Sequence, residues 1–214
     1  MNDRRRRLEH ARLYLVCDER PDTFVEGALR GGVDIVQLRI KDADDERVLA
    51  AAARYRRLCR AAGALLIVND RPDLAAAADA DGVHVGQDDV AVSRARQVVG
   101  EQLIVGLSTH SPGQVDAAAS AGVDYIGVGP VHVTPTKPGR PAVGYELVSY
   151  ASRHCKLPFF AIGGIDASNV TAARGAGARR IAVVRALTGA ADPERAARSL
   201  RGALTEQQVR VGAT

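Results

Sequence analysis

Eight short apolar runs, separated by longer stretches rich in Ala, Arg and Leu, constrain this chain more than any other feature. The runs have the length and the Val, Ile and Leu content of buried strands, and the intervening stretches, such as residues 44–62, favour helix. The expected strands are Leu13–Cys17, Ile35–Leu38, Leu65–Val68, Val83–Val85, Leu103–Gly106, Tyr125–Val128, Phe159–Ile162 and Ile181–Val184. Eight strands are the number that closes a parallel sheet on itself. We therefore predict an α/β fold, a single-domain (β/α)8 TIM barrel with its active site at the carboxyl ends of the strands.

A doubly wound open sheet is the alternative, because its strands and helices alternate in the same way. The G-x-G-x-x-G fingerprint of a dinucleotide-binding sheet does not follow the first run. The 214 residues, 46% of them apolar, suit one domain with a full core. We expect a basic segment at 1–11 that is flexible or adds a helical turn, a catalytic barrel at 12–206 and a tail at 207–214.

Composition argues against several classes of protein. No apolar run approaches the roughly 20 residues of a membrane-spanning helix, and no signal-peptide core follows Arg4–Arg7. Cys17, Cys59 and Cys155 are too widely spaced for a CxxC metal site and too few for a disulfide framework, which predicts a cytoplasmic protein. The net charge of +4 is modest, and the arginine cluster lacks interleaved aromatic residues. We interpret that cluster as a solvated or frayed tail and expect neither a nucleic acid nor a membrane partner.

Polar and charged residues stand at the ends of the runs, where a barrel would gather them. Gln37, Arg39 and Lys41 alternate along one strand and its exit, so their side chains are expected on the same side. If that side is the barrel interior, they form an anion-binding arrangement at its mouth. The alternative is a solvated strand end.

Carboxylates follow the next two runs. Asn69 and Asp70 end one, and Asp88 and Asp89 come shortly after the next. Adjacent parallel strands lie about 5 Å apart, so one Mg²⁺ could contact a carboxylate from each. The alternatives are an Asx turn at Asp70 and a helix cap at Asp88 or Asp89. The residues alone do not decide which of Asp88 and Asp89 faces inward.

Further polar residues follow the fifth run. Ser108 is expected just after that strand, where Ser108 or Thr109 could also serve a turn, and Ser111 before Pro112 is typical of a helix N-cap. Two histidines nearby, His84 inside an apolar strand and His110, are predicted to be structural.

Two later segments are typical of phosphate binding. The Pro- and Thr-rich segment 129–141 is long for a loop in a small domain and suggests a flap over phosphate groups, with an exposed connector as the alternative. Glycines at the end of the seventh run, Gly163 and Gly164, and the end of the eighth run stand where barrels often hold phosphate with main-chain amides.

Six motifs occur in order across almost the whole chain: Q-L-R-x-K, V-N-D, D-G-V-H-x-G-Q-x-D, G-x-S-T-H, T-P-T-K-P-G and I-G-G-I. As an ordered set they resemble the thiamine-phosphate synthase family. The resemblance implies a transferase that condenses 4-amino-5-hydroxymethyl-2-methylpyrimidine diphosphate with a thiazole phosphate, or its carboxylated form, to give thiamine phosphate and pyrophosphate. It also implies one Mg²⁺ per subunit, dissociative loss of pyrophosphate and two phosphorylated substrates as the partners, and it leaves a homo-oligomer open.

The resemblance also implies roles for individual residues. The pyrimidine diphosphate would be bound by Gln37, Leu38, Arg39, Ile40, Lys41, Asn69, Ser108 and Lys137, of which Arg39, Lys41, Ser108 and Lys137 would be catalytic. The thiazole phosphate would be bound by Thr134, Pro135, Thr136, Gly164, Val184 and Arg185, and Mg²⁺ by Asp70 and Asp89.

Arg185 departs from the family pattern, because the family usually has Ser at this position. A cradle of main-chain amides would tolerate the exchange, and the guanidinium could add a charged contact. His132 also departs from the usual apolar or aromatic residue and is given no role. Two other functions stay open: an isomerase that resembles the thiazole tautomerases, and a phosphate-ligand sensor without turnover.

Overall fold

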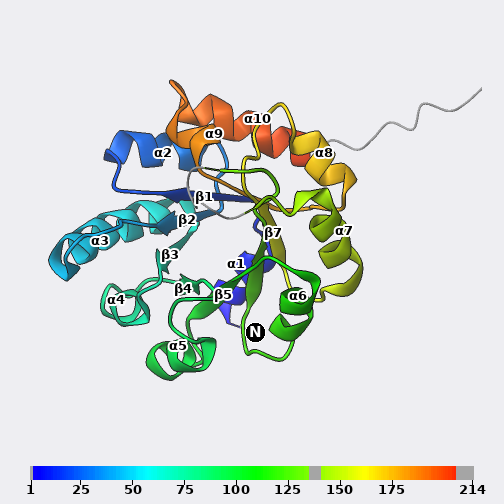
Figure 1. Cartoon of the computed structure of the whole chain (residues 1–214). Coiled ribbons are helices and arrows are strands. Elements are labelled where there is room, and N and C mark those ends of the chain that lie inside the picture. The colour runs from blue at the N-terminus through cyan, green and yellow to red at the C-terminus, as the bar shows by residue number, and fades with distance from the viewer. Residues whose placement is uncertain (1, 135–140, 206–214) are drawn as a thin grey trace, which may run out of the picture.

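In the computed structural model, which describes residues 2–134 and 141–205, eight parallel strands close into a barrel (Figure 1). The strands are β1 (Leu13–Cys17), β2 (Ile35–Leu38), β3 (Leu65–Asn69), β4 (Gly82–Val85), β5 (Ile104–Thr109), β6 (Tyr125–Val128), β7 (Phe159–Ile162) and β8 (Ile181–Val183). Because β1 pairs with both β2 and β8, the sheet has no open edge, and the alternative of an open doubly wound sheet is wrong. The predicted TIM barrel is confirmed.

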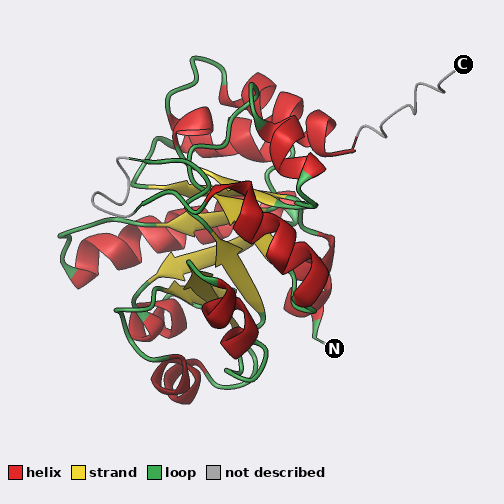
Figure 2. Cartoon of the chain, turned by 45° about the vertical axis from the view of Figure 1, so that its right-hand side comes forward, coloured by secondary structure: helices red, strands yellow, loops and turns green. Residues whose placement is uncertain are grey.

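Helices surround the strands and cover the outside of the barrel (Figure 2). In the described part of the chain they are α1 (Asp3–His10), α2 (Asp22–Arg30), α3 (Asp45–Ala62), α4 (Pro72–Ala77), α5 (Val92–Val99), α6 (Pro112–Ala118), α7 (Gly144–His154), α8 (Val170–Gly175), α9 (Arg185–Thr188) and α10 (Pro193–Thr205). No helix among these described residues is both long and apolar enough to cross a membrane.

Alternation along each strand divides the apolar side chains between two cores. In β1, Leu13 and Leu15 pack outward against the helices, whereas Tyr14 and Val16 point into the barrel. This is the period of two that a pleated strand imposes. The inner core is filled by large side chains from β1, β2, β3, β5, β6 and β7, so the barrel is solid below its mouth.

The fifth strand is longer than its apolar run indicates. We expected it to end at Gly106 with Ser108 just beyond it, but β5 continues to Thr109. Ser108 and Thr109 pair with Gly127 and Val128 of β6, and the Thr109 hydroxyl donates to the Gly127 carbonyl. Inter-strand pairing thus overrides the low apolar content at the end of the run. Helix α6 begins as predicted, with Ser111 accepting from the Gln114 amide.

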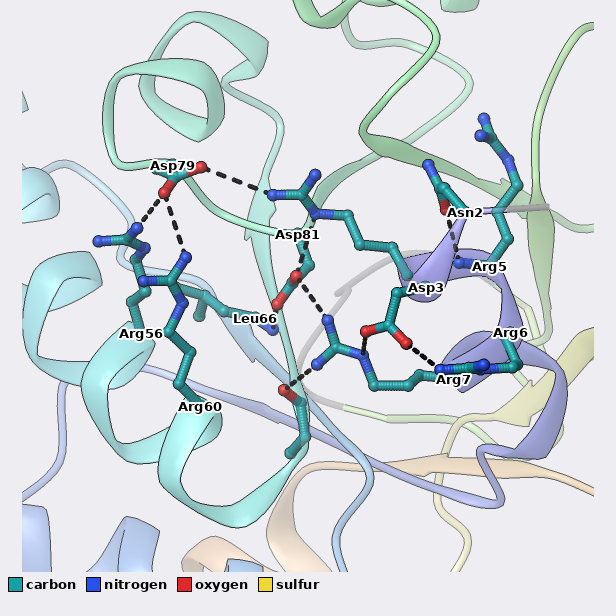
Figure 3. A network of polar contacts seen from close by, with 12 residues as sticks. Asn2, Asp3, Arg5, Arg6, Arg7, Arg56, Arg60, Leu66, Asp79 and Asp81 are labelled. Carbon is teal, nitrogen blue, oxygen red and sulfur yellow. Dashed lines mark hydrogen bonds and ion pairs between the residues drawn. The ribbon is translucent and has the colours of Figure 1, made fainter.

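The arginine cluster near the N-terminus forms the first turns of α1, which lies across the amino-terminal end of the barrel (Figure 1). Arg7 pairs with Asp81, as Figure 3 shows, and Arg4 pairs with the same carboxylate. Arg5 Nε lies 2.6 Å from Asp124 Oδ1. The interpretation of a solvated or frayed tail is therefore wrong for these three arginines. Their carboxylate partners are about 75 to 120 residues away in sequence, beyond what local patterns can indicate.

Three aspartates at the amino-terminal edge of the barrel have the same structural role. Asp34, Asp81 and Asp124 each directly precede an even-numbered strand and accept a main-chain N–H from the preceding, neighbouring strand, at Leu13, Leu66 and Val105. The carboxylates satisfy amides at the amino-terminal edge of the barrel. This edge is therefore occupied by structural ion pairs, and the opposite edge remains for a functional site.

Candidate active site

Two cavities of different chemistry open at the carboxyl ends of the strands and share the side chain of Ser108. One, of about 290 Å³, extends over β5 to β8 and is mainly apolar, and the other, of about 230 Å³, extends over β2 to β5 and is mainly polar. Ser108 is 9% exposed at the end of β5, between the two groups of strands. Two ligands bound side by side would therefore meet near this hydroxyl.

The polar cavity contains the carboxylates predicted at the ends of β3 and β4. It is lined by Arg39, Asn69, Asp70, His84, Gly86, Gln87, Asp88, Asp89 and Ser108. Asp70 and Asp89 are hydrogen-bonding neighbours, and Asn69 Nδ2 donates to Asp70 Oδ2 at 2.5 Å. Asp70 has a left-handed backbone with φ of 60°, a conformation that Asp and Asn adopt more readily than most residues. Asp70 and Asp89 thus concentrate negative charge on one side of the polar cavity.

The environment of Asp70 raises its pKa from 3.8 to about 6. Burial is the largest cause, followed by the charge and the hydrogen bond of Asp89, while Arg39 and Asn69 act in the opposite direction. Asp89 thus disfavours the ionisation of Asp70, and a divalent cation would neutralise the charge that two neighbouring carboxylates bring together. Within the described residues no group of three or more His, Cys, Asp and Glu side chains forms a metal site, so a cation here would need further oxygen ligands from water or substrate.

The turn after β4 holds Asp89 in place through a glycine that the sequence analysis did not single out. The Gly86 amide donates to Asp89 Oδ2 at 2.8 Å, and a Cβ on Gly86 would lie 2.5 Å from the same oxygen. Only glycine lets the carboxylate fold back so closely. Helix α5 begins without a side-chain cap, so neither Asp88 nor Asp89 serves as its cap. Gln87, also missed, donates to the Ser108 carbonyl at 2.6 Å.

The residues of the Q-L-R-x-K motif lie in different places. Gln37 points into the barrel, whereas Leu38 is buried in the outer core, so only its main chain could take part in a site. Arg39 lines both the polar cavity and an adjoining groove of about 400 Å³. Ile40 and Lys41 line only the groove, beside the acidic Asp18 and Glu19.

The larger cavity approaches the main chain at the ends of β7 and β8. Its lining includes Thr134, Gly164, Val184 and Arg185, the described members of the expected thiazole-phosphate site. Gly163 and Gly164 have φ of +106° and +66°, and side chains there would overlap Pro130 and His132. Glycine is therefore required both for the backbone conformation and for the approach of the neighbouring loop. Arg185 is the only Arg or Lys among the described residues that line this cavity.

The start of the long loop after β6 is tied to β7. The amides of Val131 and His132 donate to the carbonyls of Ile162 and Gly163, at 2.8 and 3.0 Å. His132 Nε2 also lies 3.0 Å from the Tyr145 hydroxyl. Pro135, Thr136 and Lys137, three residues of the expected site, lie outside the described residues.

Both histidines predicted to be structural reach the site. His110 lines the larger cavity, and its Nδ1 contacts the Gly129 carbonyl. His84 lines the polar cavity and joins a chain of buried polar groups inside the barrel. The chain runs from Gln37 Nε2 to the hydroxyls of Tyr14 and Tyr125, then through Nδ1 and Nε2 of His84 to Ser108 Oγ, with distances of 2.8, 2.8, 3.0 and 3.0 Å. Position within an apolar run gave no indication of these contacts, which come from five different strands.

Comparisons with known proteins identify the family to which this chain is similar. The family model described as thiamine monophosphate synthase matches residues 13–187. A thiamine-phosphate synthase of Saccharopolyspora erythraea is 51% identical over 210 residues, which cover 92% of this chain and 94% of that protein. One of Nostoc punctiforme is 52% identical over 194 residues, covering 90% of this chain and 55% of that protein. The chain thus spans little more than half the length of the latter and of several other curated relatives.

A solved structure is similar to this chain in both fold and sequence. The thiamine phosphate pyrophosphorylase of Pyrococcus furiosus superposes with a TM-score of 0.84 at 33% identity. The match covers 94% of this chain and 96% of that one, so the likeness extends over the whole barrel.

Proposed function

The chain belongs to the thiamine monophosphate synthase family, and from this membership we propose that it joins 4-amino-5-hydroxymethyl-2-methylpyrimidine diphosphate to a thiazole phosphate. The products would be thiamine phosphate and pyrophosphate. The observation that carries the proposal is the pair of unlike cavities that meet at Ser108. A condensation needs two substrates side by side with their reacting atoms at a shared boundary.

We assign the diphosphate to the polar cavity and its groove. Arg39 borders both spaces, and its guanidinium can donate two parallel hydrogen bonds to phosphate oxygens. Lys41 in the groove supplies a second positive charge, and Lys137 is expected to supply a third. These cations would stabilise the charge that develops on the leaving pyrophosphate.

The carboxylates fit a magnesium ion in composition and charge. Asp70 and Asp89 would hold it, and Asn69 would orient Asp70 through their hydrogen bond. Two protein carboxylates, completed by water and substrate phosphate oxygens, are a common arrangement for this ion. When bound, Mg²⁺ neutralises phosphate charge and so makes pyrophosphate a better leaving group.

The reaction needs no nucleophile from the protein. The bond between the pyrimidine methylene carbon and the diphosphate oxygen breaks with its electron pair on the oxygen, and the thiazole nitrogen lone pair forms the new carbon–nitrogen bond. The cysteines offer little as an alternative, because none lines either cavity and burial raises the pKa of Cys17 to about 12. Binding, orientation and charge stabilisation are what the chain's own residues would contribute.

The larger cavity is assigned to the thiazole phosphate. Apolar side chains such as Ile162 and Ile165 suit the ring, and the main chain at Gly164 and Val184 can approach the phosphate. Arg185 would add a charged contact in place of the hydroxyl that the family usually carries. Thr134 and Thr136 would complete the phosphate site.

The reaction can be tested by mixing the purified protein with the two substrates and Mg²⁺ and measuring both products, with EDTA added to a parallel sample. We expect thiamine phosphate and pyrophosphate in equal amounts, and neither in EDTA. Asp89→Asn should raise the Mg²⁺ concentration needed for half-maximal rate, whereas Asp42→Asn, at an exposed position, should not. Binding of the thiazole phosphate without product formation would instead support an isomerase or a sensor. The cytoplasmic location stays a prediction.

A further inference from the structure

The hydrogen bonds of the polar chain inside the barrel run in one donor-to-acceptor direction, which follows from the groups at its two ends. Gln37 Nε2 carries only donor hydrogens, so the Tyr14 hydroxyl accepts from it and has its own proton left for Tyr125. Tyr125 then donates to His84 Nδ1, which lies 3.0 Å away. A neutral histidine that accepts at Nδ1 carries its proton on Nε2 and donates to Ser108 Oγ.

The tyrosines are suited to hold this direction. Tyr14 is 2% and Tyr125 0% exposed, and burial raises the pKa of both, so each hydroxyl keeps its proton. Phe160 packs edge-on against both rings, with centroids 5.2 and 5.6 Å away. The Tyr125 ring also lies directly over Gly106 of β5, where any Cβ would overlap it. Packing thus fixes the rings, and hydrogen bonds fix their hydroxyl protons.

The last group of the chain is at the boundary of the two cavities. Ser108 Oγ accepts from His84, and in the described part of the chain no acceptor receives its own proton. That proton is therefore available to a ligand. The thiazole nitrogen cannot accept it, because its lone pair forms the new bond. Since Ser108 also lines the polar cavity, we assign the proton to an oxygen or nitrogen atom of the pyrimidine diphosphate.

We propose that Tyr125 and His84 are positioning residues that act through Ser108. The hydrogen-bonded groups from Gln37 to Ser108, which we call the relay, hold His84 as the Nε2–H tautomer. They turn the Ser108 hydroxyl outward as a hydrogen-bond donor to the pyrimidine diphosphate. The role in turnover rests on the proposed function, whereas the tautomer is a property of the unliganded protein.

The tautomer is tested by nitrogen NMR of the protein with ¹⁵N-labelled histidine, using His84→Gln to assign the signals. We expect a protonated Nε2 and an unprotonated Nδ1 at neutral pH. A protonated Nδ1 would reverse the chain and overturn the proposal. Because this measurement uses the wild-type protein without substrate, it decides the direction of the relay even if thiamine phosphate is never formed.

The action through Ser108 is tested by a double-mutant cycle on kcat/KM for the pyrimidine diphosphate. Tyr125→Phe should lower it about tenfold, in line with loss of one well-oriented hydrogen bond, but by less than about twofold when Ser108 is already Ala. Equal losses in both backgrounds would show a merely structural role and overturn the proposal. Tyr55→Phe, which removes a fully buried hydroxyl from α3 outside the relay, should change kcat/KM by less than about twofold.

Discussion

Replacing Asp70 with Asn should stabilise the metal-free protein at neutral pH while impairing its proposed use of magnesium. Asp70 is partly buried beside Asp89, and its pKa is raised from 3.8 to about 6. A raised pKa means that folding favours the protonated acid. The stability that this group contributes is therefore full below about pH 4 and is lost as the pH rises through 6. Asn is neutral at every pH and tolerates the left-handed backbone at this position.

The size of the effect follows from the pKa and the exposure of the side chain. The gap between 3.8 and about 6 corresponds to at most about 3 kcal/mol, at about 1.4 kcal/mol for each pH unit. Solvent screening of a half-buried carboxyl reduces this to roughly 1 to 2 kcal/mol. For a chain of this length the melting temperature should rise by about 2 to 8 °C.

The assay is thermal unfolding in EDTA at pH 7.5 and at pH 4, with Asp42→Asn as the matched control. Asp42 also has a left-handed backbone, with φ of 55°, but is exposed. We expect Asp70→Asn to melt above wild type at pH 7.5 and together with it at pH 4, and Mg²⁺ to raise the melting temperature of wild type only. An Asp70→Asn variant no more stable than wild type at pH 7.5, or a gain that Asp42→Asn shares, would refute the reasoning.

Two further changes test other parts of the molecule. Arg185→Ala should raise KM for the thiazole phosphate about tenfold, the effect of losing one charge-assisted hydrogen bond at a partly solvated site, and leave KM for the pyrimidine diphosphate unchanged in steady-state kinetics. An equal effect from Arg198→Ala, at an exposed position of α10, would show that only general charge matters. Asp124→Ala should lower the free energy of unfolding by about 3 kcal/mol in urea titrations, because it removes the carboxylate partner of Arg5 and Arg96 and the acceptor of a β5 amide. Asp3→Ala, which removes a carboxylate that is 58% exposed, should cost less than about 1 kcal/mol, and similar losses for the two would argue against a buried network.

The architecture could be predicted from the amino-acid sequence, because the signals for it are local. The length and composition of the apolar runs, and the helix-favouring stretches between them, need only neighbouring residues. Four of the eight strands, among them Leu13–Cys17 and Tyr125–Val128, have the predicted bounds. A barrel also fixes which ends of the strands lie together. Once a barrel is predicted, Asn69, Asp70 and Asp89 are therefore expected together at one edge of it.

Which of these residues contact one another depends on the tertiary fold and could not be predicted from the sequence. The strand register brings His84 beside Asn69, the Gly86 turn folds Asp89 back toward Asp70, and pairing with β6 extends β5 to include Ser108. The ion pairs of α1 and the relay from Gln37 to Ser108 join side chains between 23 and 119 residues apart in the chain. A sequence pattern reports what each residue would do among its neighbours along the chain. The partner of a buried charge or hydroxyl is set by closure of the barrel, which brings distant strands within hydrogen-bond distance.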